Sequence, residues 1–179
     1  MRFNVAILIV AASCGSTLAQ QQPYAGMETR AIKTLSDQQI ADLKAGNGMG
    51  LALAAELNGY PGPRHTIDLA NQLQLSADQL AKLQELYAAM KAETIPIGTT
   101  LIAQERHLND EFAGHTITLA GLQTATQQIG ATQATLRAAH LKYHLATVAI
   151  LTPEQIKRYD ELRGYGGDAA PEHQRHHMQ

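Results

Sequence analysis

The sequence contains little cysteine, few aromatic residues and almost no net charge. Its 179 residues include one cysteine, no tryptophan and two phenylalanines, and the formal net charge is −2. A single cysteine excludes an intramolecular disulfide and any zinc or iron–sulfur site built from several cysteines. The low charge provides no basic field, so we expect no nucleic-acid partner. Aromatic residues, on which β-sandwiches and barrels draw, make up only 4%, while alanine and leucine are abundant, so the composition favours helices.

Sequence patterns of common enzymes are also missing. The chain has no Gly-x-Ser-x-Gly segment and no His-Glu-x-x-His segment. The glycine-rich run at residues 46–50 lacks the spacing of a phosphate-binding loop and does not follow a predicted strand. We therefore expect no enzymatic activity and no required cofactor.

Residues 1–19 have the three parts of a secretory signal peptide. Arg2 supplies the positive charge, an apolar stretch follows, and residues 17–19 (TLA) form a cleavage site before Gln20. The alternative is a lipobox ending at Cys14, which would anchor the protein as a lipoprotein. We favour the signal peptide, which predicts export to the periplasm. Since no later segment is long and apolar enough, we expect no stable membrane span.

Helix caps and turn residues divide the rest of the chain. We expect a flexible lead-in over residues 20–35 and a short helical extension over 36–63. A helical hairpin domain follows over 64–165, and a disordered, histidine-containing tail occupies 166–179.

Apolar residues recur every three or four positions along two long segments of the hairpin domain. The first runs from about residue 77 to 112 and contains Pro96, which we expect to kink the helix without ending it. The second runs from about 119 to 150, and a shorter helix ends at Gly164. The predicted fold is all-α, a long antiparallel helical hairpin with flanking short helices. Such a thin fold predicts an exposed apolar or concave face or a homodimer partner.

One short motif occurs twice, once before the first long helix and once before the last helix. The copies read LSADQ at 75–79 and LTPEQ at 151–155. Each has a leucine, a hydroxyl residue that caps a helix, and a glutamine three positions after the cap: Leu75, Ser76 and Gln79, then Leu151, Thr152 and Gln155. Two copies in register with an exported helical hairpin resemble the LTxxQ motif of the Spy/CpxP family, which includes CnrX- and ZraP-like metal sensors. An unrelated hairpin with good caps is the alternative.

The resemblance implies a periplasmic all-α protein without enzymatic activity, often a cradle-shaped dimer. Some members of the family act as ATP-independent chaperones, and others bind divalent metals or tune an envelope-stress pathway. The sequence departs from the small chaperones in two ways. Residues 32–63 have no counterpart in them, and the net charge is slightly acidic where the chaperone cradle is basic.

Two histidines on the second long helix form a candidate metal site. His140 and His144 are four residues apart, so they project from one face of the helix. His65, on a short helix matching one that carries ligands in the metal-sensing relatives, would join them, with Glu93 as an additional candidate. Imidazoles in this arrangement can share zinc, nickel or copper. The alternative is that His140 is a partly buried residue of the helix seam and His144 a surface one.

Two functional hypotheses and a residual one follow. The first is a chaperone or envelope-stress accessory whose partners are unfolded or envelope proteins, held on the apolar face of the hairpin. The second is a periplasmic heavy-metal sensor or binding protein that uses the histidines of the hairpin. The residual hypothesis is a purely structural envelope protein.

Overall fold

The computed structural model describes residues 24–165, and the predicted signal peptide and tail lie outside this range. After a 3₁₀ turn (η1), the described residues form six α-helices and no named strand. Their bounds are η1 Met27–Thr29, α1 Asp37–Ala45, α2 Leu53–Glu56, α3 Pro63–Asp68, α4 Ala77–Ala113, α5 Leu119–Val148 and α6 Pro153–Arg163. The all-α prediction is confirmed. None of the helices in this range is both long and apolar enough to cross a bilayer.

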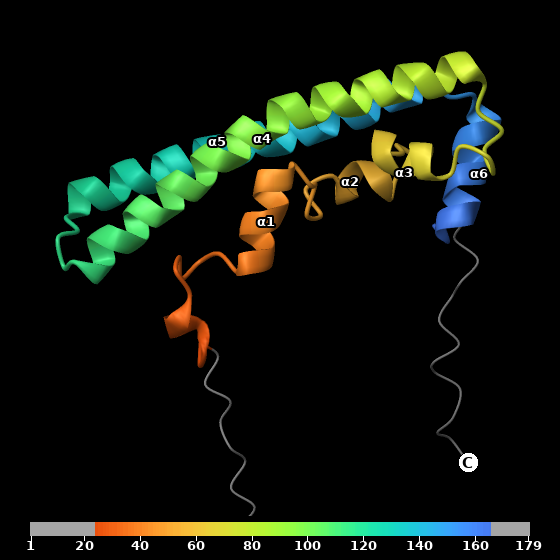
Figure 1. Cartoon of the computed structure of the whole chain (residues 1–179). Helices are drawn as coiled ribbons and strands as arrows, with labels where there is room; N and C mark the ends of the chain where they lie inside the picture. Colours follow the sequence, from red (N-terminus) through yellow and green to blue (C-terminus); the bar gives the residue numbers. More distant parts are fainter. Residues whose placement is uncertain (1–23, 166–179) are drawn as a thin grey trace, which may run out of the picture.

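The helices α4 and α5 pack against each other as the predicted long hairpin (Figure 1). As predicted, α4 continues past Pro96. The seam between the two helices is built from apolar side chains at three- and four-residue spacing. Those that are buried include Leu83, Met90, Leu101, Ile102, Ile129, Leu136 and Ala139.

The sequence predicts a capping box at residues 36–39 (SDQQ) as well as in the two copies of the motif, and all three are formed, at the starts of α1, α4 and α6. In each, the hydroxyl oxygen of the cap accepts a hydrogen bond from the backbone N–H of the glutamine three residues later. The glutamine Oε1 in turn accepts a hydrogen bond from the N–H of the cap. These pairs satisfy amide groups that a helix start leaves free, which explains why the helices begin where the motifs stand.

The extension that precedes the hairpin packs along one side of it. Figure 1 shows α1, α2 and α3 on the same side of the α4–α5 pair. Ile32 and Leu43 are buried in one apolar cluster with residues of both long helices, namely Leu101, Ile102, Ile129 and Leu136. Ile32, within the predicted lead-in, is fully buried. Much of the apolar face that we expected to be exposed on the hairpin is therefore covered by residues 32–51.

Two glycines allow α1 to approach α4 closely. A Cβ atom on Gly98 would lie 2.6 Å from the carbonyl oxygen of Leu43, which is too close for any other residue without a shift of the backbone. Gly46 ends α1 in the left-handed conformation (φ 63°) and lies against Thr94. The ammonium group of Lys91 donates a hydrogen bond to the carbonyl oxygen of Ala45, the last residue of α1. The backbone at the end of α1 therefore lies in close contact with α4 of the hairpin.

Candidate functional site

The two copies of the repeated motif meet at one end of the hairpin. The amide nitrogen of Gln79 donates to Oε1 of Gln155 at 2.8 Å, and the amide nitrogen of Gln155 donates to Oε1 of Gln79 at 3.1 Å. Each nitrogen also donates to a backbone carbonyl in a turn, that of Ile150 after α5 for Gln79 and that of Leu73 before α4 for Gln155. The motif is therefore a structural joint between the starts of α4 and α6.

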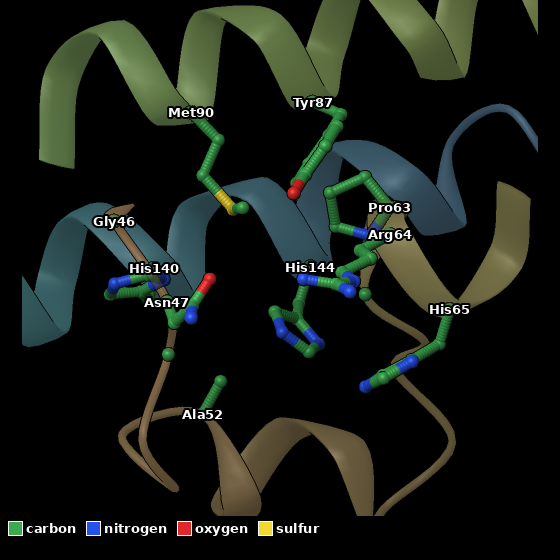
Figure 2. A pocket seen from close by; sticks show the side chains of 12 residues that line it. Gly46, Asn47, Ala52, Pro63, Arg64, His65, Tyr87, Met90, His140 and His144 are labelled. Carbon is green, nitrogen blue, oxygen red and sulfur yellow. The ribbon is translucent and has the colours of Figure 1, made fainter. Parts of the chain in front are cut away.

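The three histidines predicted as metal ligands line a single pocket of about 200 Å³. The pocket lies between α5, the start of α3 and the loop after α1. Figure 2 shows Met90 reaching toward α5 from α4, and His65 approaching from α3. The fold therefore brings together a chain segment near residue 65 and one near residue 140, as the sequence predicted.

His140 lies at the base of this pocket and is almost fully buried, with 2% of its surface exposed. Its Nε2 atom has no hydrogen-bond partner among the described residues. Burial, and next the neighbouring His144, lower the pKa of His140, so its imidazole stays neutral near pH 7. A neutral ring nitrogen that is buried without a partner leaves its capacity for a hydrogen bond or a metal bond unused.

His144 is held by the turn before α3. Its Nδ1 lies 2.6 Å from the carbonyl oxygen of Tyr60. Because a carbonyl oxygen only accepts, Nδ1 carries the hydrogen of this bond, and Nε2 takes no part in it. The ring also packs on Gly62, where a Cβ would lie 2.8 Å from Cε1. A backbone carbonyl on one ring nitrogen is the support that metal-bound histidines commonly have.

The other two candidate metal ligands, His65 and Glu93, are less closely tied to the pocket. The side chain of His65 is 44% exposed, and its Nδ1 lies 3.5 Å from the carboxylate of Asp68. Glu93 does not line the pocket. Its carboxylate binds Lys142 at 2.6 Å and accepts a hydrogen bond from Tyr143 at 2.8 Å. These bonds, the one from Lys142 first, lower the pKa of Glu93. Within residues 24–165, no group of three His, Cys, Asp or Glu side chains is arranged to hold a metal ion.

Sequence reasoning missed a buried carboxylate next to this pocket. Glu56, on α2, is 7% exposed and accepts hydrogen bonds from the hydroxyl of Tyr159 and the N–H of Gly62. The guanidinium of Arg163 lies 3.7 Å from it and the hydroxyl of Tyr165 lies 3.3 Å from it. Burial and the bond to Glu56 raise the pKa of Tyr159, so its hydroxyl remains a donor. This cluster ties the extension to α6, and no local pattern signals a contact between residues 103 positions apart.

Comparison with known proteins identifies the family. A model of the LTXXQ motif family matches residues 64–163, which is more than half of the chain and includes both copies of the motif. The chain belongs to the LTXXQ motif family. This is the family of Spy/CpxP-like periplasmic proteins, which are known as non-enzymatic, and the resemblance predicted from the repeated motif is confirmed. No curated protein and no solved structure gives a match.

This LTXXQ protein has a second hollow, an open groove between α1 and α5. Its volume is about 560 Å³. Apolar side chains from the extension and from the hairpin form its surface, among them Leu35, Leu43, Met49, Leu51, Leu101 and Leu136. Three polar side chains, those of Gln39, Gln133 and Arg137, also line it. We call this hollow the α1–α5 groove.

The extension of the LTXXQ protein also carries apolar side chains that face solvent. Met49, Leu53 and Leu57 are 41%, 55% and 56% exposed, and they lie in the turn before α2, at its first residue and directly after its end. Tyr60, at the following turn, is 40% exposed. Scattered exposed leucines are ordinary, but a run of them beside an open apolar groove indicates a surface for contacts with another molecule.

Proposed function

We propose that this LTXXQ protein binds unfolded or partly folded envelope proteins in the periplasm without ATP, as a chaperone or an accessory of the envelope-stress response. The observation that carries the proposal is the apolar lining of the open α1–α5 groove, together with the exposed side chains of Met49, Leu53 and Leu57 on the extension. Unfolded chains expose apolar side chains, and an apolar surface that is open in the folded protein can cover them. Family membership supports the same function.

The surface proposed for clients differs from the bare hairpin face that we expected from the sequence. Residues of the extension cover Leu101, Ile102 and Leu136, and the groove that stays open is lined by side chains of both the extension and the hairpin. Methionine and leucine side chains on such a surface adapt to many partners. The low net charge of −2 suits clients that are recognised by apolar contact more than by charge.

An aggregation assay tests this function. A chemically denatured client is diluted into buffer without ATP, and light scattering is followed with and without the LTXXQ protein. We expect scattering to fall as the ratio of the protein to the client rises. An unchanged scattering curve at several-fold molar excess would refute the chaperone function.

A second candidate function is binding of a divalent or soft metal ion at His140 and His144. The buried, unpartnered Nε2 of His140 favours it, together with the support that Tyr60 gives to His144. His65 and the thioether of Met90 line the same pocket. Two secure imidazoles and a thioether suit zinc, nickel or copper, with copper favoured by the sulfur.

Calorimetric titration with zinc, nickel and copper tests the metal site. The protein should end at residue 165, so that His173, His176 and His177 of the tail contribute nothing. We expect binding that His140→Ala removes and that His107→Ala leaves unchanged, because His107 is 69% exposed and lies outside the pocket. Affinity weaker than ~100 μM, about −5 kcal/mol, would exclude a specific site.

Export and dimerisation belong to the same proposal. N-terminal sequencing of protein recovered from the periplasm should begin at Gln20, whereas a lipid-modified Cys14 would show the alternative processing. Light scattering coupled to gel filtration should give a mass of two chains if the thin hairpin pairs with a second copy, and of one chain if it does not.

A further inference from the structure

The α1–α5 groove has the size and position of a ligand site. At about 560 Å³ it falls within the range of pockets that bind small molecules or side chains of a peptide. Its apolar residues come from segments far apart in sequence, with Leu35 and Leu43 from the extension and Leu101 and Leu136 from the hairpin. Leu43, Leu101 and Leu136 are each 5% exposed or less, so this part of the groove is firmly packed. A hollow with a fixed apolar floor can hold a partner without first refolding.

The polar side chains of the groove suit a peptide better than a plain hydrocarbon chain. Oε1 of Gln39 accepts a hydrogen bond from the N–H of Ser36 at 2.8 Å, which leaves its amide nitrogen without a partner in the described structure. The side chain of Gln133, exposed on α5, forms no hydrogen bond within residues 24–165. Side-chain amides offer the same donor and acceptor groups as a peptide backbone. A hydrocarbon ligand could not form a hydrogen bond with the side-chain amide of either glutamine.

Arg137 gives the groove a charge preference. Arg137 is exposed on α5 and forms no salt bridge within residues 24–165, and the other side chains that line the groove are uncharged. A guanidinium beside an apolar surface pairs readily with a carboxylate, and it does so through two parallel hydrogen bonds. The preferred partner therefore carries an acidic residue next to its apolar segment.

We propose that the α1–α5 groove binds a short, extended apolar segment of a client protein, with an acidic residue of that segment paired to Arg137. Leu and Met side chains contact the apolar residues of the client, and the amides of Gln39 and Gln133 bind its backbone. The proposal rests on the proposed client-binding function and assigns it a site and a partner chemistry. Met49, at the edge of the groove and 41% exposed, adapts to client side chains of different shape.

Gly130 provides a matched pair of variants for this site. It lines the groove on α5, and a Cβ there would meet no atom within 4 Å. Gly130→Ala therefore adds little volume and favours the helix, whereas Gly130→Leu places a bulky side chain in the groove. Arg137→Gln removes the charge alone. Arg106→Gln is its control, since Arg106 is exposed on α4 and lies outside the groove.

The probe is a short fluorescein-labelled peptide with a run of leucines followed by one glutamate, and its binding to the full mature chain is followed by fluorescence anisotropy. We expect Gly130→Leu to weaken binding at least about tenfold and Gly130→Ala to change it less than about twofold. Arg137→Gln should weaken binding about threefold to fivefold, as expected for an exposed ion pair, and Arg106→Gln should not. The effect of Arg137→Gln should vanish when the peptide carries glutamine in place of glutamate. Circular dichroism confirms that each variant is folded.

The outcomes separate this proposal from the proposed function. If the wild-type protein binds the peptide in a manner sensitive to Gly130→Leu but does not reduce aggregation, the groove is a peptide site and the chaperone function fails. If the wild-type protein and Gly130→Leu bind the peptide equally well, the site lies elsewhere and the groove proposal is overturned. Binding of sodium dodecanoate that Gly130→Leu abolishes, with no binding of the peptide, would also overturn it, because the occupant would then be an amphiphile.

Discussion

Gln79 and Gln155 hydrogen-bond to each other in both directions, at 2.8 and 3.1 Å, although they lie 76 residues apart. Each of them also completes the cap of its own helix by accepting a hydrogen bond from the N–H of Ser76 or Thr152. The repeated motif therefore does two things at once. It starts two helices, and the hydrogen bonds between its two glutamines hold those helix starts together at one end of the hairpin.

This joint predicts coupling between the two glutamines. Gln79→Ala and Gln155→Ala should each lower the free energy of unfolding by about 1–2 kcal/mol, because each leaves partly buried polar groups unpaired. The double variant should lose less than the sum, by about 0.5–1 kcal/mol, since the bonds between the two amides are lost only once. Urea unfolding of the four proteins measures the coupling. Additive losses would show that the two motifs act independently.

Close packing of α1 on α4 predicts opposite effects of alanine at two glycines. Gly98→Ala should destabilise the protein by about 1–3 kcal/mol, because its Cβ would lie 2.6 Å from the carbonyl oxygen of Leu43. Gly130→Ala is the matched control, since its Cβ meets open space and alanine favours a helix by about 0.5–1 kcal/mol. Melting temperatures of both variants test the pair. A more stable Gly98→Ala variant would show that α1 does not rest on α4.

The buried carboxylate of Glu56 predicts that the extension depends on α6. Glu56→Gln keeps the shape but removes the charge that Tyr159 and Arg163 face, and we expect it to lose about 2 kcal/mol of stability. Amide hydrogen exchange should then speed up in residues 53–62 more than in α4. Exposed Glu28 provides the control, as Glu28→Gln should change neither quantity. Uniform exchange across the chain would contradict a local role for Glu56.

The environment of His140 predicts how stability depends on pH. Burial, and then His144, lower its pKa in the folded state, so as the pH falls the unfolded chain takes up the proton first. The contribution of His140 to stability is therefore complete above the unfolded value near 6.5 and is lost as the pH falls below it. Between pH 6.5 and the lowered folded pKa, this group alone should reduce the free energy of unfolding by up to about 1.4 kcal/mol per pH unit.

Two histidine variants isolate this effect. His140→Leu should show a shallower decline between pH 6.5 and 5 and should be at least as stable as the wild type at pH 7, because it removes an unpartnered buried nitrogen. Exposed His107 serves as the control, and His107→Leu should follow the wild-type pH profile. Urea unfolding across this pH range provides the data. A wild-type slope in His140→Leu would mean that another group governs the decline.

Local signals in the sequence predicted most of the helices. Capping boxes located the starts of α1, α4 and α6, and Pro96 was correctly assigned to the interior of α4. The short helices were predicted less well. Within the extension expected to be helical over 36–63, only α1 and the four residues of α2, Leu53–Glu56, form helices before α3 begins at Pro63. Short helices depend on packing with their neighbours more than on their own residues.

Tertiary contacts account for what the sequence did not reveal. The spacing of His140 and His144 indicated a shared face, but burial of His140 depends on the loop after α1, which no periodicity connects to it. In the sequence, Leu43 is one apolar residue of a weakly amphipathic helix. Its close contact with α4 depends on Gly98, which has no side chain to keep the Leu43 backbone away. The exposed apolar surface was predicted on the hairpin, whereas the structure distributes it over the extension and the hairpin because residues 32–51 cover part of α4 and α5.

The central claim is that this LTXXQ protein binds unfolded chains through exposed apolar surface. The most direct measurement is a binding titration with one client in two forms, a permanently unfolded form such as a reduced and carboxymethylated small protein and the same protein folded with its disulfides intact. We predict saturable binding of the unfolded form without ATP, at least about tenfold tighter than that of the folded form, with only a modest dependence on salt because most of the contacts are apolar. Equal binding of both forms, or no binding of the unfolded form, would contradict the claim.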